Sequence, residues 1–160
     1  MVDKLSPEEL TGWLEWASAR LLATPSQRIK PQEPGVLWPA YSQDKFEILD
    51  FRAGIALRAL APSSAEIPIM DEILLLPNLC TTSLSRRAIR LRSLVNPLTG
   101  SHLYKWHEIA SKLETKQYTT RHAYQVGLTE IIKRTPRPTI ARIGVFMDAN
   151  EGVYAPAAKI

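Results

Sequence analysis

The chain of 160 residues is 45% hydrophobic and contains a single cysteine, Cys80. These values predict one globular domain, or a domain with tails, and they exclude general disorder and an internal disulfide. No apolar run reaches the roughly 18 residues that a membrane span needs, and the N-terminus lacks the layout of a signal peptide, so we expect a cytoplasmic protein without a membrane partner.

Charge is distributed unevenly along the chain, whose formal net charge is +4. Residues 1–80 hold seven Lys/Arg and eleven Asp/Glu, which gives this half a net charge of −4. Residues 81–142 hold twelve Lys/Arg and three Asp/Glu, which gives a net charge of +9. Because a basic surface attracts polyanions, nucleic acid is the first candidate partner for the second half.

The first predicted helix begins after Ser6. Ser6 and Glu9 have the spacing of a capping box, with Pro7 at the first helical position. Apolar residues then recur at helical spacing as far as Thr24. They are Leu10, Trp13, Leu14, Ala17 and Leu21. The stretch "TPSQRIKPQEPGVLWPAYSQ" holds four prolines and is predicted to be a loop.

Three further helices are predicted before residue 100. One begins at Phe46 and is apolar on two sides, so we expect other elements to cover both. A short helix in "SSAEIPIMDEILLLPNL" is expected to end at Pro77. The stretch "TTSLSRRAIRLRSLVNP" forms the third, with Arg86, Arg87 and Arg90 largely facing outward.

Residues 105–131, "KWHEIASKLETKQYTTRHAYQVGLTEI", contain two helical patterns with a polar break between them. We expect Thr115 or Thr119 to cap the second helix, and the small residues Ala123 and Gly127 to let the two helices approach closely. The inner face of the first helix is predicted to hold Trp106, Ile109, Ala110 and Leu113. That of the second is predicted to hold Thr120, Tyr124, Leu128, Ile131 and Ile132.

The outer face of the second helix carries side chains suited to nucleic acid. They are Lys116, Gln117, Thr119, Arg121, His122 and Gln125. A helix-turn-helix places such a helix in the major groove, about 12 Å wide, while the first helix crosses the phosphates. Arg121 then matches guanine, and Gln117 or Gln125 matches adenine. The alternative is a helical hairpin whose polar side is only solvated, but the net charge of +9 favours binding to DNA or binding in association with RNA polymerase.

A second set of basic residues is predicted to contact phosphates or a polymerase. It consists of Arg86, Arg87, Arg90, Arg92, Lys105 and Lys112. The four arginines lie on one predicted helix that has no acidic residue four positions on to pair with them. An external anionic partner is therefore favoured over a solvated face.

Residue patterns for an enzyme or a cofactor site are missing. The three histidines lack a second ligand at metal-binding spacing, and Cys80 has no Cys or His beside it. Asp71 and Glu72 are more simply the solvated face of a helix. We expect a non-enzymatic protein without metal or cofactor.

The last segment, residues 135–160, is predicted to be an irregular tail. It holds three prolines and no sustained period, and only "IGVFM" suggests a β pattern. The fold class is therefore predicted as all-α: a helical bundle ending in a helix-turn-helix, with a proline-rich loop and this tail. Its parts are an acidic helical region (1–80), a basic helix-turn-helix region (81–134) and the tail (135–160).

The segment "RRAIRLRSLVNPLTGSHLYKWHEIASKL" followed by "YTTRHAYQVGLTEI" resembles the helix-turn-helix of sigma-factor region-4-like domains. With "MDEILLLPNL" upstream, residues 66–134 resemble a family of small phage and prophage proteins that includes the C-terminal part of gene transfer agent activators. The resemblance implies a regulator of late or packaging genes, either an activator or an antiterminator. Its implied partners are promoter DNA, bacterial RNA polymerase and, as a further candidate, another regulatory protein.

Two positions depart from the family pattern. Glu114 stands where Gly is usual in the turn, and Lys116 stands where Ser usually caps the second helix. Because a left-handed conformation costs Glu free energy, we expect a longer or differently shaped turn. The departures also keep open a protein partner in place of DNA.

Two rival functions fit the same residues. A small terminase subunit also marks DNA with such a motif, and it would form a ring of many subunits. A polymerase adaptor that does not bind DNA would capture polymerase without any retention on DNA.

Overall fold

The computed structural model describes residues 5–24 and 61–150. Apart from Thr24, the predicted proline-rich loop and the predicted helix from Phe46 lie outside these residues. Every regular element within them is a helix, which confirms the all-α prediction. The elements are α1 (Pro7–Ala23), α4 (Ile67–Leu75), the 3₁₀ helix η4 (Leu76–Leu79), α5 (Ser83–Ser93), α6 (Trp106–Lys112), α7 (Gln117–Arg134) and α8 (Arg137–Ala149).

Helix α1 begins with the predicted capping box. The Ser6 hydroxyl accepts a hydrogen bond from the backbone N–H of Glu9 at 3.1 Å, and the Glu9 carboxylate accepts one from the N–H of Ser6 at 2.7 Å. Trp13 and Trp16 are buried, as expected of core residues. The helix packs against α4, α5 and α7, so residues from both halves of the chain share one core.

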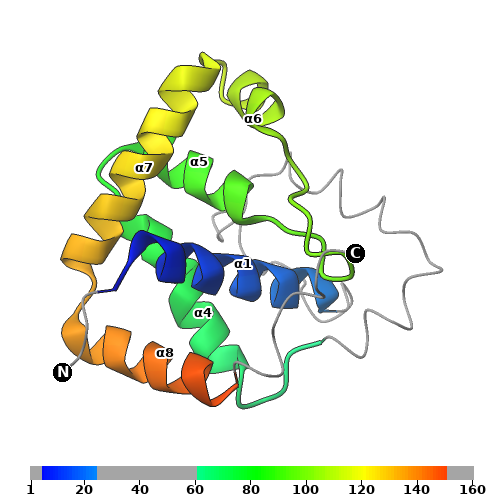
Figure 1. Ribbon diagram of the computed structural model, residues 1–160, viewed down its shortest axis with the longest axis vertical. Coiled ribbons are helices and arrows are strands. Elements are labelled where there is room, and N and C mark those ends of the chain that lie inside the picture. The colour runs from blue at the N-terminus through cyan, green and yellow to red at the C-terminus, as the bar shows by residue number, and fades with distance from the viewer. Residues whose placement is uncertain (1–4, 25–60, 151–160) are drawn as a thin grey trace, which may run out of the picture.

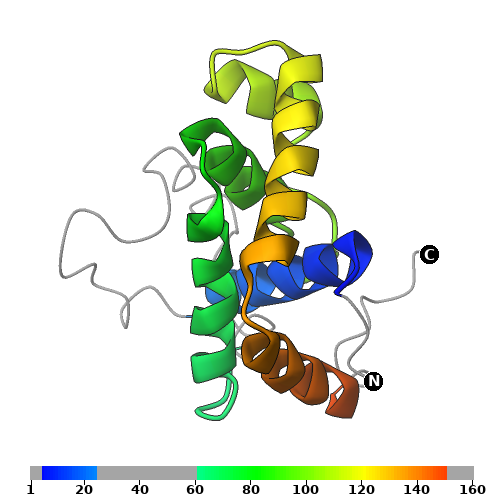
Figure 2. The same ribbon diagram turned by 90° about the vertical axis from the view of Figure 1, so that its left-hand side faces the viewer.

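Helix α7 connects the two ends of the molecule. Its N-terminal end lies beside α6 at one end, and its C-terminal end leads to α8 at the other (Figure 1; Figure 2). One cluster of buried residues joins α1, α4, α7 and α8, and a second joins α5 and α6 to Leu22 of α1. Partly buried Tyr124 of α7 packs against both clusters, so α7 links them.

Residues 137–149 correct the prediction of an irregular tail from residue 135. They form α8, whose Ile143 is fully buried, and "IGVFM" lies inside this helix and not in a strand. Pro138 is tolerated because it lies in the first turn, where a backbone N–H has no partner within the helix. The remaining ten residues of the predicted tail, 151–160, lie outside the described residues.

The close approach at Gly127 also differs from the prediction. A Cβ atom at Gly127 would lie 2.6 Å from Cδ1 of Ile89 and 3.0 Å from Cβ of Ser85, both on α5. Gly127 therefore lets α7 approach α5, and not α6 as the sequence suggested. The short helix α4 ends at Leu75 and continues as one 3₁₀ turn past Pro77, a small shift from the expected end.

Candidate nucleic-acid interface

The turn between α6 and α7 is short, in contrast to the prediction of a longer or differently shaped one. Glu114 adopts a left-handed conformation, with φ of 53°. The N–H of Thr115 donates to the carbonyl of Ala110 at 3.0 Å, and the N–H of Glu114 donates to that of Ser111 at 3.1 Å. These two bonds form a Schellman motif, which ends α6 at the position that usually favours glycine.

The start of α7 is capped differently from the prediction. Lys116 is the N-cap residue, without a side-chain capping bond, and neither Thr115 nor Thr119 takes that position. The Thr115 hydroxyl instead lies 2.7 Å from the hydroxyl of buried Thr120, which also donates to the carbonyl of Lys116 at 3.1 Å. This hydroxyl pair fixes the turn against the first residues of α7.

All six residues predicted to contact DNA are exposed at this end of the molecule. They are Lys116, Gln117, Thr119, Arg121, His122 and Gln125. Tyr118, which the sequence analysis did not single out, is 81% exposed, and its ring stacks on His122 with centroids 6.4 Å apart and planes 9° apart. The spacing of Tyr118 and His122, four residues apart on a predicted helix, could have indicated this contact from the sequence.

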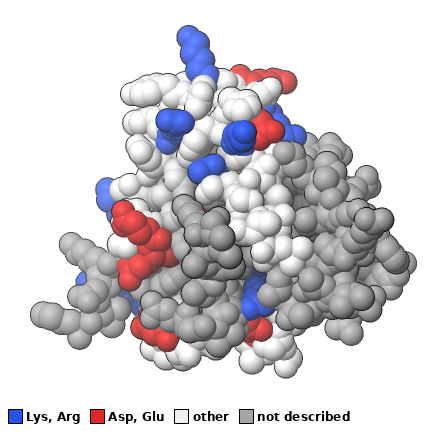
Figure 3. All heavy atoms as spheres, turned by 45° about the vertical axis from the view of Figure 1, so that its right-hand side comes forward, with Lys and Arg blue, Asp and Glu red and all other residues white. Residues whose placement is uncertain are grey.

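The exposed part of α7 lies within a mainly basic region of the surface. Lys and Arg side chains gather toward the end formed by α6 and the start of α7, with a smaller number of acidic side chains among them (Figure 3). Lys105, which precedes α6, is exposed, and its backbone N–H donates to Glu108 at 2.7 Å. Lys112 is half-buried, with its Nζ 5.0 Å from the ring centroid of Tyr104.

Trp106, at the start of α6, has its ring close to arginines of two neighbouring helices. The guanidinium carbon of Arg92, on α5, lies 4.8 Å from the centroid of its ring, and that of Arg121, on α7, lies 5.5 Å from it. Tyr124 packs edge-on against the same ring, with centroids 5.3 Å apart. Arg92 also donates to the carbonyl of Tyr104 at 3.3 Å. We call Arg92, Trp106 and Arg121 the arginine–tryptophan cluster.

The other arginines of α5 face outward less than predicted. Arg86 and Arg90 are only partly exposed, whereas Arg87 is exposed. Arg86 donates to the carbonyl of Cys80 at 3.1 Å, and Arg90 donates to the side-chain oxygen of Asn78 at 2.5 Å. These acceptors lie in η4 and directly after it, so a count of acidic residues along α5 does not reveal them.

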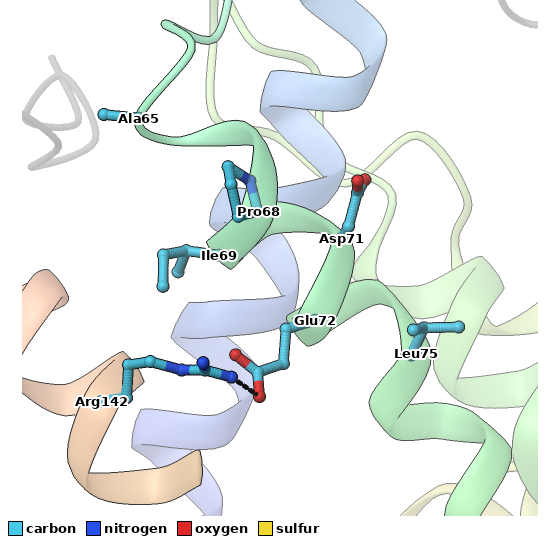
Figure 4. A pocket seen from close by; sticks show the side chains of 7 residues that line it. All are labelled: Ala65, Pro68, Ile69, Asp71, Glu72, Leu75 and Arg142. Carbon is cyan, nitrogen blue, oxygen red and sulfur yellow. Dashed lines mark hydrogen bonds and ion pairs between the residues drawn. The ribbon is translucent and has the colours of Figure 1, made fainter.

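A shallow groove lies at the opposite end of the molecule, between α4 and α8 (Figure 4). It is lined by Ala65, Pro68, Ile69, Asp71, Glu72, Leu75 and Arg142. Glu72 and Arg142 form an ion pair across it, whereas Asp71 is exposed. Leu75 is 50% exposed beside it, so the groove has an apolar wall and an acidic edge.

Reactive groups are few within residues 5–24 and 61–150. Cys80 is buried, donates to the carbonyl of Gly127 at 3.6 Å, and has its pKa raised to about 11, chiefly by desolvation. Within those residues no three His, Cys, Asp or Glu side chains gather as a metal site would require. In the same part of the chain, no helix is both long and apolar enough to cross a bilayer.

Comparisons of the chain with protein families, with curated proteins and with solved structures found no match. The functional interpretation therefore rests on the residues and their geometry.

Proposed function

We propose that this protein is a transcription regulator of the phage or gene-transfer-agent type, an activator or antiterminator that binds duplex DNA through the exposed start of α7 and also contacts RNA polymerase. The observation that carries the DNA half of the proposal is the joint exposure of the six predicted contact residues on the first turns of one helix. A helix presented in this way fits a major groove, whose base edges offer donors and acceptors to the side chains of Gln117 and Gln125.

The surroundings of α7 support the same proposal. Helix α6 and the Schellman turn place a second short helix beside the start of α7, as a helix-turn-helix requires. The basic residues around this end provide the phosphate attraction on which most nucleic-acid affinity depends. Tyr118 adds an apolar ring that can contact the methyl group of thymine.

The test is binding of a randomised duplex pool by the immobilised protein at increasing salt. We expect retention to fall as salt rises, with a logarithmic slope of about −3 for three or four neutralised phosphates. Sequencing of the retained duplexes gives the preferred site, and Gln117→Ala with Gln125→Ala is expected to change that preference. Lys116→Ala is expected to weaken retention, whereas Lys133→Ala, an equal change of charge near the other end of α7, is the matched control. Absence of retention at low salt would refute the proposal.

The groove between α4 and α8 favours a second candidate, a polymerase adaptor that does not bind DNA. Its apolar wall and acidic edge suit a protein surface better than a phosphate backbone. Under this alternative, purified polymerase binds the protein and Leu75→Asp abolishes the binding, while no duplex is retained. If Leu75→Asp abolishes polymerase binding but DNA binding is kept, the groove is instead the surface through which the proposed regulator contacts polymerase.

A further inference from the structure

The arginine–tryptophan cluster draws residues from three helices onto one aromatic ring. Arg92 comes from α5, Trp106 from α6 and Arg121 from α7, and both guanidinium carbons lie within 5.5 Å of the ring centroid. The ring is held in turn by Tyr124, whose hydroxyl lies 3.2 Å from that of Thr11 on α1. The position of the Trp106 ring is therefore set by packing within the protein.

A cation–π contact leaves the N–H groups of a guanidinium available. It uses the positive charge of the arginine and none of its five planar N–H donors in a hydrogen bond. Arg92 uses one of them on Tyr104, and the structure gives Arg121 no hydrogen bond or ion pair among residues 5–24 and 61–150. Several donors are thus left for an acceptor outside the chain.

The two positive charges are also close enough to oppose each other. Desolvation chiefly lowers the pKa of Arg92, the neighbouring Tyr124 raises it, and the charge of Arg121 makes the smallest contribution, a further lowering. Glu15 acts in the opposite direction on Arg92, but its carboxylate also lies 3.6 Å from His102. An anion bound by both arginines would relieve the repulsion.

We infer that Arg92 and Arg121, held by Trp106, clamp one phosphate group of the nucleic-acid backbone. This inference rests on the proposed function and deepens it. A phosphodiester offers two unbridged oxygens that match the planar donors of Arg. The Arg121 guanidinium lies near a ring of α6, the helix expected to cross the phosphates. It therefore contributes affinity and not base discrimination, contrary to the sequence-based expectation that it pairs with guanine.

The test measures affinity for two short duplexes, one of alternating A·T pairs and one of alternating G·C pairs, as a function of salt. We expect Arg121→Ala and Arg92→Ala each to weaken both duplexes by the same factor, on the order of tenfold at low salt, and to make the salt slope shallower by about 1. Because the two arginines share one phosphate, the double variant should lose clearly less than the product of the two factors.

Three further variants make the result interpretable. Arg121→Lys keeps the charge but loses the planar fork, so it should keep the salt slope and lose affinity. If Arg92→Ala lowers the thermal midpoint because the hydrogen bond to Tyr104 is lost, Arg92→Lys takes its place in the comparison. Arg137→Ala removes an equal charge at the start of α8, far from the cluster, and should change neither affinity nor slope.

Several outcomes would overturn the inference. Loss confined to the G·C duplex would show that Arg121 pairs with a base, and additive losses with a slope change of about 2 would show two separate phosphates. Both of these results leave DNA binding intact. Failure of the unaltered protein to bind either duplex would overturn the proposed function together with the clamp.

Discussion

Glu114 is the residue on which the geometry of the candidate interface most depends. Its left-handed conformation ends α6 and turns the chain into α7 within a few residues. A side chain with a Cβ atom adopts that conformation at a cost of about 1 kcal/mol or more, which glycine avoids. Glu114 is also exposed, so its negative charge lies on the surface that we propose faces phosphates.

Replacement of Glu114 should therefore improve both stability and DNA affinity. We expect Glu114→Gly to raise the free energy of unfolding by about 1 kcal/mol, as measured by urea denaturation, because the strain is removed. Glu114→Gln removes the charge but keeps the strain, so it should strengthen DNA binding without added stability. A Glu114→Gly protein less stable than the original would show that the turn does not depend on this conformation.

Cys80 provides a second prediction at the residue scale. Burial raises the pKa of its thiol from an ordinary value of about 9 to about 11. Below pH 9 the fraction of thiolate is thus roughly 100-fold smaller in the folded protein, and alkylation by iodoacetamide should be at least that much slower than in urea.

Linkage gives the sign of the stability effect at Cys80. The pKa of the thiol is higher in the folded than in the unfolded protein. The protonated thiol therefore makes its full contribution to the free energy of unfolding below pH 9, and this contribution is lost as the pH rises toward 11. Cys80→Ala should lack this part of the pH dependence. Rapid alkylation of the folded protein at pH 8 would contradict the burial of the thiol.

At the scale of elements, the spacing of α5 and α7 is set where Gly127 meets Ile89 and Ser85. We expect Gly127→Ala to lower the free energy of unfolding by about 1 kcal/mol, because the overpacking penalty exceeds the gain in helix propensity. Gly12→Ala is the matched control: no atom of residues 5–24 and 61–150 lies within 4 Å of the added Cβ, so it should stabilise α1 by about 0.5–1 kcal/mol. Equal effects of the two changes would rule out a close contact at Gly127.

Helix α8 is an integral part of the core and not an appended segment. Ile143 is fully buried within the cluster formed with α1, α4 and α7, and the ring of Phe146 packs edge-on against Trp16 at 5.7 Å. We expect Ile143→Ala to lower the free energy of unfolding by about 2–4 kcal/mol, through lost burial and the cavity left behind. Val145→Ala, in the same helix but at a side chain that is 71% exposed, should change it by less than about 0.5 kcal/mol. Thermal unfolding of both variants checks this difference.

At the scale of the whole molecule, local patterns predicted most of the described helices, because periodic apolar faces and capping residues act within one element. The capping box at Ser6 and the buried faces of α6 and α7 are examples. Contacts between distant segments were not predictable in this way. No local sequence pattern indicates which acceptors bind Arg86 and Arg90, or that α7 packs on α5 at Gly127. Helix α8 is not predicted because residues 135–160 hold three prolines and no sustained period, although Pro136 and Pro138 lie at the start of the helix, where proline is tolerated.

Helices α4 and α8, which line the apolar groove, lie at the end of the molecule opposite to α6 and the start of α7 (Figure 1; Figure 2). Helix α7 extends from the candidate DNA surface toward α8, which forms one wall of the groove. This separation would let a regulator contact a promoter and a polymerase at the same time. Inactivation of one contact should then leave the other intact.

The most direct test of the proposed interface is an NMR titration of the isotope-labelled protein with a short DNA duplex at low salt. The account predicts that the amide signals of residues 116–125 and the indole signal of Trp106 shift together with increasing duplex, while those of α8 stay unchanged. Shifts centred on α4 and α8, or no shifts at any duplex concentration, would contradict it.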